Sequence, residues 1–267
     1  MARSGNRKTQ SKAKPRGNKP NNTRPHGRAV PGIHSVKEVF EVRPHKVLEL
    51  WVKDSFENKE IQGVIEKAKY SEVKLKKVKS QDLSQICETH QGIVAFVDET
   101  PELIWEDIKK DDPAIYLCLD EIQDPHNLGA ILRTSWLLGV KGIFVANQKS
   151  NLLTPSACKV ACGGAEHVPV DFHSSLPNLL KELQKHNFWV YGLDMGGKHD
   201  LWSSELQLPE KIVWVIGNEG KGIRKPIKNI CDEIVHIEQT NRGASFNASV
   251  ATAIALGETV RRHRQDS

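Results

Sequence analysis

Short apolar segments recur along the second part of the chain, and stretches with a helical spacing of apolar residues separate them. Near-continuous apolar strands that alternate with helices are typical of βαβ units, in which helices cover both faces of a mostly parallel sheet. The pattern therefore predicts an α/β domain over residues 114–267. Its predicted strands are Ile115–Leu119, Gly142–Ala146, Val168–Val170, Phe188–Leu193, Ile212–Ile216 and Ile234–Ile237.

Helix-start signals lie between these predicted strands. Thr154 precedes Pro155, and Ser175 lies two residues before Pro177. A side-chain oxygen followed by proline is typical of the first turn of a helix. A last helix is predicted from Ser245 to about residue 261, because apolar residues recur there along one face.

A smaller α/β pattern precedes this domain, over residues 31–98. Apolar residues between positions 61 and 68 fall at helical spacing, and Ser80 is a candidate cap of a short helix that ends near residue 90. The predicted strands of this module are Lys46–Val52, Lys74–Val78 and Gln91–Val97.

Polar residues separate the two patterns. The segment 99–113 contains Pro101 and Pro113, and the composition shifts after it towards regularly spaced apolar strands. We therefore predict that 99–113 is a linker between two domains.

The positive charge of the chain is concentrated at its N-terminus. Residues 1–30 contain nine Lys or Arg and no acidic residue, whereas the other 237 residues contain 29 basic and 33 acidic ones. Because Asn, Gly, Pro and Ser dominate this segment, we expect a disordered basic tail. A polycation of this kind binds phosphate backbones, which indicates a nucleic-acid partner; a solubilising tail without a partner is the alternative.

The cysteines and the lengths of the apolar runs indicate the cellular compartment in which the protein is expected. The five cysteines are an odd number and none forms a Cys-x-x-Cys pair; Cys158 and Cys162 lie four residues apart without a second pair of ligands nearby. We therefore expect reduced thiols and no metal site. No apolar run approaches the roughly 20 residues that cross a bilayer, and the N-terminus lacks the apolar stretch of a secretory signal. We expect a soluble, cytoplasmic protein without a membrane partner.

Three segments that directly follow predicted strands carry candidate chemistry. In the first, Asp120–Thr134, Pro125 and Gly129 set a turn into a helix, with Asn127 near its start and Arg133 about two turns later. Taken alone, an Asn at a helix start is most often a cap, and an Arg there is most often a surface charge.

The second segment, Val215–Ile223, has three glycines within six residues, which let the backbone approach a ligand closely. Its spacing is not that of a dinucleotide fingerprint, and a plain turn is the alternative. The third segment, Ile237–Ala251, gathers Ser245, Asn247 and Ser249 at the opening of the last predicted helix, where they would orient a polar ligand. Ordinary capping by Ser245 is the alternative.

The order and spacing of the three segments resemble the signature motifs of the SpoU (TrmH-like) RNA 2'-O-ribose methyltransferases. The first resembles the family's Asn-x-Gly-x-x-x-Arg, the second its Gly-x-Glu-Gly-x-Gly, and the third its Ser-hydrophobic-Asn-x-Ser-Val-Ala. The third motif departs from the family pattern at Glu238 and Asn241, which replace the usual Pro and Gly, and at Phe246, which replaces Leu. The positions that match are Asn127, Gly129 and Arg133, then Gly217, Glu219, Gly220 and Gly222, then Ser245, Asn247, Ser249, Val250 and Ala251.

The resemblance extends upstream, because the segments starting at Gly32 and His90 resemble the ends of the small L30e-like RNA-binding domain of the ribosomal RNA branch. It implies a parallel α/β sheet with a deep C-terminal trefoil knot (SPOUT-like), preceded by an L30e-like α/β domain at 31–98. It also implies a homodimer that binds RNA.

By the same resemblance, the activity is S-adenosylmethionine-dependent 2'-O-methylation of a ribose in ribosomal RNA, with a guanosine of 23S rRNA as the expected target. The alternatives are a tRNA 2'-O-ribose methyltransferase and a non-catalytic RNA-binding factor in ribosome assembly. The implied catalytic residues are Arg133, Asn127, Glu219, Ser245 and Asn247, and the implied cofactor-binding residues are Gly192, Gly217, Asn218, Gly220, Ile237 and Phe246.

Overall fold

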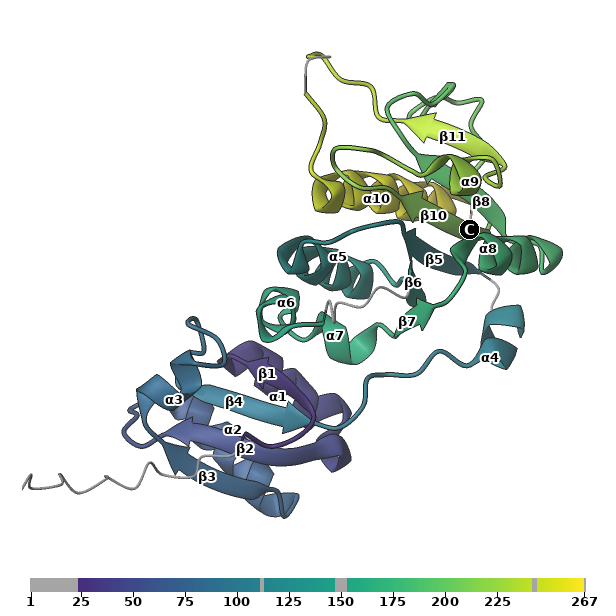
Figure 1. Ribbon diagram of the computed structural model, residues 1–267. Helices are drawn as coiled ribbons and strands as arrows, with labels where there is room; N and C mark the ends of the chain where they lie inside the picture. Colours follow the sequence, from purple (N-terminus) through teal and green to yellow (C-terminus); the bar gives the residue numbers. More distant parts are fainter. Residues whose placement is uncertain (1–23, 111–112, 147–152, 242–243, 267) are drawn as a thin grey trace, which may run out of the picture.

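The computed structural model describes residues 24–110, 113–146, 153–241 and 244–266, which form two separate β-sheets with helices around each (Figure 1). The first sheet has the order β1-β4-β2-β3, in which only the pair β2–β3 is parallel. Its elements are β1 (Arg28–Pro31), α1 (Ile33–Val42), a 3-10 turn (Pro44–Lys46), β2 (Val47–Lys53), α2 (Lys59–Tyr70), β3 (Lys74–Val78), α3 (Ser80–Ser84) and β4 (Ile93–Val97).

The second sheet has the order β7-β6-β5-β10-β8-β11-β9, and every pairing in it is parallel. A short helix, α4 (Trp105–Lys110), precedes it within the predicted linker. Its strands are β5 (Ala114–Leu119), β6 (Gly142–Ala146), β7 (Val170–His173), β8 (Trp189–Leu193), β9 (His199–Asp200), β10 (Lys211–Ile216) and β11 (Glu233–His236). The helices are α5 (Pro125–Leu137), α6 (Pro155–Ala161), α7 (Gly164–His167), α8 (Leu176–Lys185), α9 (Lys225–Lys228) and α10 (Ala248–Asp266).

Helices cover both faces of this sheet, which confirms the predicted α/β class with a parallel sheet. On one face, Leu128 of α5 and Leu256 of α10 belong to the same buried cluster as Leu117 and Trp214 of the sheet. On the other face, the buried side chains of α8 and α9 pack against the alternate residues of β5 and β10. Burial on both faces is why these strands are almost continuously apolar in sequence.

The structure corrects several predicted boundaries. β1 begins at Arg28, inside the segment 1–30 that was predicted to be a disordered tail. Ala29 and Val30 are buried in this strand and pair with β4. The strand was not predicted because its apolar run is too short to be recognised in the sequence. Ser80 is the first residue of α3 rather than its cap, and this helix ends at residue 84 instead of near residue 90. The remainder of the tail, residues 1–23, lies outside the described residues.

The short helices α6 and α7 lie between α5 and the first sheet (Figure 1). Glu166 of α7 has only 1% of its side chain exposed, and its two carboxylate oxygens accept hydrogen bonds from Arg28 Nη2 at 2.6 Å and Arg43 Nη1 at 3.3 Å. Cys158 of α6 packs within the hydrophobic core of the first sheet. The two sheets are therefore joined by a polar and apolar contact as well as by the chain between them.

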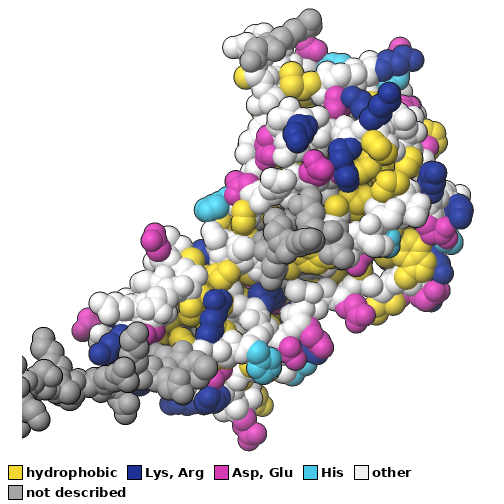
Figure 2. All heavy atoms as spheres, viewed as in Figure 1, with side chains coloured by type: hydrophobic (Ala, Val, Ile, Leu, Met, Phe, Trp, Pro, Cys, Tyr) yellow, Lys and Arg dark blue, Asp and Glu magenta, His cyan; other side chains and the backbone are white. Residues whose placement is uncertain are grey.

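Charged side chains of both signs are interspersed on the face shown in Figure 2 rather than gathered into one patch. In the described part of the chain no helix has the length and apolar character needed to cross a membrane. Nor do the described His, Cys, Asp and Glu side chains form a group of three or more that would hold a metal ion.

Candidate active site

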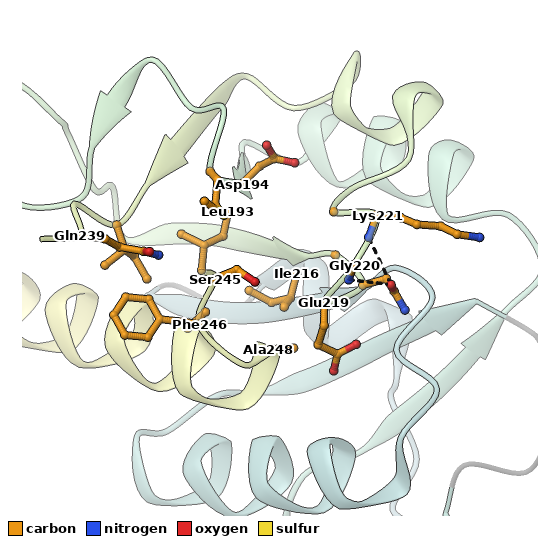
Figure 3. Close-up of a pocket in the computed structure, with 16 residues that line it drawn as sticks. Leu193, Asp194, Ile216, Glu219, Gly220, Lys221, Gln239, Ser245, Phe246 and Ala248 are labelled. Carbon is orange, nitrogen blue, oxygen red and sulfur yellow. Dashed lines mark hydrogen bonds between the residues drawn. The ribbon is translucent and has the colours of Figure 1, made fainter. Parts of the chain in front are cut away.

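A cavity of about 320 Å³ opens at the carboxyl ends of β8, β10 and β11 (Figure 3). This is the edge at which open parallel sheets bind ligands. Its walls come from four segments that are separate in sequence: Leu193–Met195 at the end of β8, Ile216–Gly222 at the end of β10, Ile237 and Gln239 after β11, and Ser245, Phe246, Ala248 and Ala251 at the start of α10.

The turn after β10 is held by its own backbone. The amide of Asn218 donates to Gly222 O at 3.2 Å, and that of Gly222 donates to Asn218 O at 2.8 Å. Asn218 Oδ1 accepts from the amides of Gly220 and Lys221 (dashed lines in Figure 3). A side chain on Gly217 would bring its Cβ within 2.3 Å of the Gly222 carbonyl carbon, so only glycine fits at that position.

Asn127 and Glu219 are 92 residues apart in sequence and meet beside the cavity, where Asn127 Nδ2 donates a hydrogen bond to Glu219 Oε1. Figure 3 shows the Glu219 side chain pointing away from the side chains of Asp194 and Lys221. Asn127 is 7% exposed and is not the cap of α5, since Asp124 Oδ1 accepts the hydrogen bond from the His126 amide at the start of that helix. The capping alternative for Asn127 is therefore wrong.

Arg133 lies two turns along α5 and is exposed. Its Nη1 lies 3.5 Å from Cys162 Sγ, and none of the ion pairs of the described residues includes Arg133. The structure therefore does not bring Arg133 into contact with Glu219. Its guanidinium is available to an anionic ligand.

The third segment supplies the opening of α10. Ser245 and Phe246 line the cavity, whereas Asn247 does not. Asn247 Oδ1 accepts from the amide of Ser249 at 2.9 Å and from its hydroxyl at 2.7 Å, and α10 begins at Ala248. The side chain that caps the helix is thus Asn247, and the alternative that Ser245 acts only as the cap is wrong.

Among the predicted cofactor-binding residues, Gly217, Asn218, Gly220, Ile237 and Phe246 line the cavity and Gly192 does not. Gly192 lies within β8, where an added Cβ would meet Ile234 Cδ1 at 2.6 Å. The residues that follow it, Leu193, Asp194 and Met195, face the cavity instead.

Two acidic residues with no predicted role connect the loops around the cavity. Asp120 is fully buried and accepts 2.8 Å hydrogen bonds from the amide and Nε of Arg224, which connects the first segment to the residue that directly follows the second. Burial raises the pKa of Asp194, but hydrogen bonds from Lys228 Nζ and the Gly196 amide hold it below its ordinary value. The sequence signal for both is an acidic residue directly after a buried strand.

Comparisons with known proteins agree on one family. Residues 114–257 match the SpoU rRNA Methylase family, and residues 29–103 match the family described as RNA 2'-O ribose methyltransferase substrate binding. The chain is 35% identical over 239 residues to the 23S rRNA (guanosine-2'-O-)-methyltransferase RlmB of Neisseria meningitidis, covering 88% of this chain and 95% of that one. The RlmB of Shewanella oneidensis is 36% identical, with 87% and 96% covered.

The fold is likewise shared with a solved structure. The SpoU methyltransferase AviRb of Streptomyces viridochromogenes, in complex with AdoMet, superposes with a TM-score of 0.77 at 20% identity, covering 88% of this chain and 90% of that one. Fold and cavity define a two-sheet α/β protein with a cavity at the carboxyl edge of its parallel sheet. The chain belongs to the SpoU rRNA Methylase family, as the three sequence motifs predicted.

Proposed function

We propose that the protein transfers the methyl group of S-adenosylmethionine to a ribose 2'-hydroxyl in ribosomal RNA, with a guanosine of 23S rRNA as the target. The observation that carries the proposal is that the second and third motif segments line one cavity, while the first segment reaches its edge through the hydrogen bond from Asn127 to Glu219. The names of the relatives at 35% and 36% identity support the substrate class, and the match of residues 29–103 to a substrate-binding family supports RNA recognition by the first sheet.

The cavity fits the cofactor in size and chemistry. Its volume of about 320 Å³ is that of a small-molecule site, and Leu193, Ile216 and Phe246 offer an apolar wall for an adenine. The carboxylate of Asp194 and the backbone carbonyls of the 217–222 turn are suited to an ammonium or a sulfonium. When bound, S-adenosylmethionine supplies an electrophilic methyl group.

The role proposed for Arg133 follows from its charge. A guanidinium has a pKa above about 12 and is a poor general base, so Arg133 holds the phosphate next to the target ribose and stabilises the oxyanion that develops on the 2'-oxygen. Its lack of a carboxylate partner among the described residues supports this role. A deprotonated Arg133 acting as the base is the less favoured variant. Positioning of this kind is worth up to about 7 to 11 kcal/mol of barrier.

The other predicted residues shape the site around that step. Glu219 holds the Asn127 amide, which in turn faces the ribose, and Ser245 forms part of the cavity wall. Asn247 fixes the start of α10 through Ser249 and so places Ser245 and Phe246. These assignments make Asn247 a positioning residue.

The proposal includes the finer architecture that the resemblance implies. We assign residues 28–98, with β1 included, to an L30e-like RNA-binding domain, 99–113 to a linker and 114–267 to a catalytic domain with a trefoil knot. Hydrogen bonds from Arg262 to the carbonyls of Leu201, Ser203 and Leu206 hold the C-terminal helix α10 against the loop that follows β9. The exposed apolar residues Leu137 on α5 and Val250 on α10 support a homodimer through these helices. We place the protein in the cytoplasm, with its RNA substrate.

The first test is the transfer of labelled methyl from S-adenosylmethionine to undermodified total RNA. We expect 2'-O-methyl label in the 23S fraction and a loss of about 100-fold to 1,000-fold in kcat for Arg133→Ala, the size expected when one oxyanion donor is removed. Cofactor affinity should stay unchanged, and Arg264→Ala, an exposed arginine at the end of α10, is the matched control. Label in tRNA would contradict the proposal that ribosomal RNA is the substrate. Cofactor binding without transfer to any RNA would favour a non-catalytic RNA-binding factor.

A further inference from the structure

Lys159 of α6 reaches from the catalytic side of the molecule to the first sheet. Its Nζ lies 2.5 Å from Oε1 of Gln91, a residue of the loop before β4. The same Gln91 oxygen accepts a hydrogen bond from the amide of Ile33 at 3.1 Å. Gln91 lies inside the part of the chain that matches the substrate-binding family. Lys159 thus sits at the junction of the two domains.

The charge of Lys159 is not neutralised within the described chain. The two arginines at the same junction, Arg28 and Arg43, share the buried carboxylate of Glu166. Lys159 has only the neutral amide oxygen of Gln91, and burial lowers its pKa, with no described carboxylate among the groups that act on it. A partly buried cation without a counter-charge loses solvation energy that an anionic ligand would restore.

The backbone of Lys159 also lies close to the side chain of Arg133. The two are linked through Cys162, whose Sγ contacts Arg133 Nη1 at 3.5 Å and the Lys159 carbonyl oxygen at 3.6 Å. Arg133 and Lys159, two basic residues without carboxylate partners in the described chain, are therefore neighbours through Cys162, and the ammonium of Lys159 reaches the domain junction at Gln91.

We propose that Lys159 binds a backbone phosphate of the RNA next to the phosphate held by Arg133, so that the strand leaves the reaction centre towards the loop that carries Gln91. This inference rests on the proposed function, since it uses Arg133 as the neighbouring RNA contact. The competing role is a purely structural one, in which Lys159 only ties the two domains together through Gln91.

Gln91→Glu separates these two roles because they predict opposite results. The glutamate keeps the acceptor oxygen for Ile33 and gives Lys159 an internal counter-charge. If the contact between Lys159 and residue 91 only holds the domains together, the new carboxylate strengthens it. If Lys159 binds an RNA phosphate, the carboxylate competes with that phosphate and weakens RNA binding. Lys159→Met removes the cation, Lys159→Arg keeps it, and Lys181→Met on α8 is a matched control for net charge at an exposed lysine.

The measurement is the association constant for an undermodified 23S rRNA transcript over a range of salt concentrations, alongside cofactor affinity and methyl transfer. We expect Gln91→Glu and Lys159→Met each to flatten the slope of log K against log salt by about 0.7 to 0.9, the value of one phosphate contact. That corresponds to about a fivefold loss of affinity at 0.1 M salt. Lys159→Arg and Lys181→Met should match the unchanged protein.

If Gln91→Glu has the RNA affinity and salt slope of the unchanged protein, the inference is wrong, and Lys159 has only the structural role of connecting the two domains. Equal losses in Lys181→Met would also overturn it, because net charge alone would then explain the effect. If the unchanged protein transfers no methyl group but Gln91→Glu still weakens RNA binding, the proposed function fails and the phosphate site stands.

Discussion

At the scale of single residues, the side chains of the motifs find partners that their local sequence does not suggest. Asn127 looks like a helix cap in sequence, but Asp124 caps α5, and the Asn127 amide is free to bond Glu219. Asn247 looks like a ligand-facing residue, yet its side chain caps α10. Capping needs an acceptor directly before the helix, and the start of each helix decides which residue that is.

Glu258 of α10 is another residue whose tertiary environment changes its properties, in this case the pKa of its carboxyl group. Its side chain is 8% exposed and accepts hydrogen bonds from Arg261 and Arg262, of which Arg262 also binds the loop that contains Leu201 and Leu206. The hydrogen bond from Arg261, opposed by burial and aided by Arg262, lowers the pKa of Glu258 from about 4.5 to about 2.

We predict that Glu258 contributes to acid sensitivity. A carboxyl with a depressed pKa contributes stability that is fully present above about pH 4.5 and is lost as the pH falls towards 2. Because Arg261 is half-exposed, solvent screening limits this contribution to about 1 kcal/mol. Unfolding free energies measured by denaturant from pH 7 to pH 3 should fall less in Glu258→Gln than in the unchanged protein. Parallel curves would contradict the prediction.

At the scale of elements, the contact between α5 and α6 positions Arg133 relative to Lys159. A Cβ on Gly129 of α5 would lie 2.6 Å from the carbonyl oxygen of Ala157 and 2.7 Å from Cβ of Val160, both in α6. The first-motif glycine is therefore needed for the close approach of the two helices that carry Arg133 and Lys159.

We predict that Gly129→Ala lowers the free energy of unfolding by about 1 to 3 kcal/mol, the usual cost of overpacking, and reduces methyl transfer as α6 shifts. Gly63→Ala in α2 is the control, since nothing lies within 4 Å of its added Cβ and alanine favours the helix by about 0.5 to 1 kcal/mol. Chemical denaturation of both variants checks the pair. Equal stabilities would show that α6 moves away from α5 without cost.

At the scale of the whole molecule, the buried carboxylate of Glu166 holds the two sheets together through Arg28 and Arg43. Removing one partner of a buried ion pair leaves the other charges unpaired, which typically costs about 3 to 5 kcal/mol. The junction is also where Lys159 meets Gln91, so its rigidity bears on the path proposed for the RNA.

We predict that Glu166→Gln lowers the midpoint of thermal unfolding and makes the segment 99–113 more susceptible to limited proteolysis, because the domains separate more easily. Glu106→Gln on α4 is the control, since Glu106 forms an exposed pair with Lys109 that contributes little. Equal melting temperatures and cleavage rates in the two variants would mean that the buried triad does not hold the domains together.

Apolar periodicity alone determined most of the second sheet. The strand predicted at Ile115–Leu119 is β5, and the predictions for β6, β8, β10 and β11 agree with the structure within one residue at each end. Such strands can be predicted from the sequence because burial on both faces of the sheet requires a continuous apolar run. β1 and β9 were missed because they are short edge strands, which hydrogen bonds to their neighbours define more than their own apolar content does.

The spacing of three motifs also determined the family, because each motif lies in one uninterrupted segment that can be read locally. Only the tertiary structure decided which side chains meet. Asn127 finds Glu219 across 92 residues, Lys159 finds Gln91 across 68, and Arg28 finds Glu166 across 138. The physical reason is that such pairs depend on how strands are ordered in a sheet and how helices dock on it, and no local pattern in the chain encodes either.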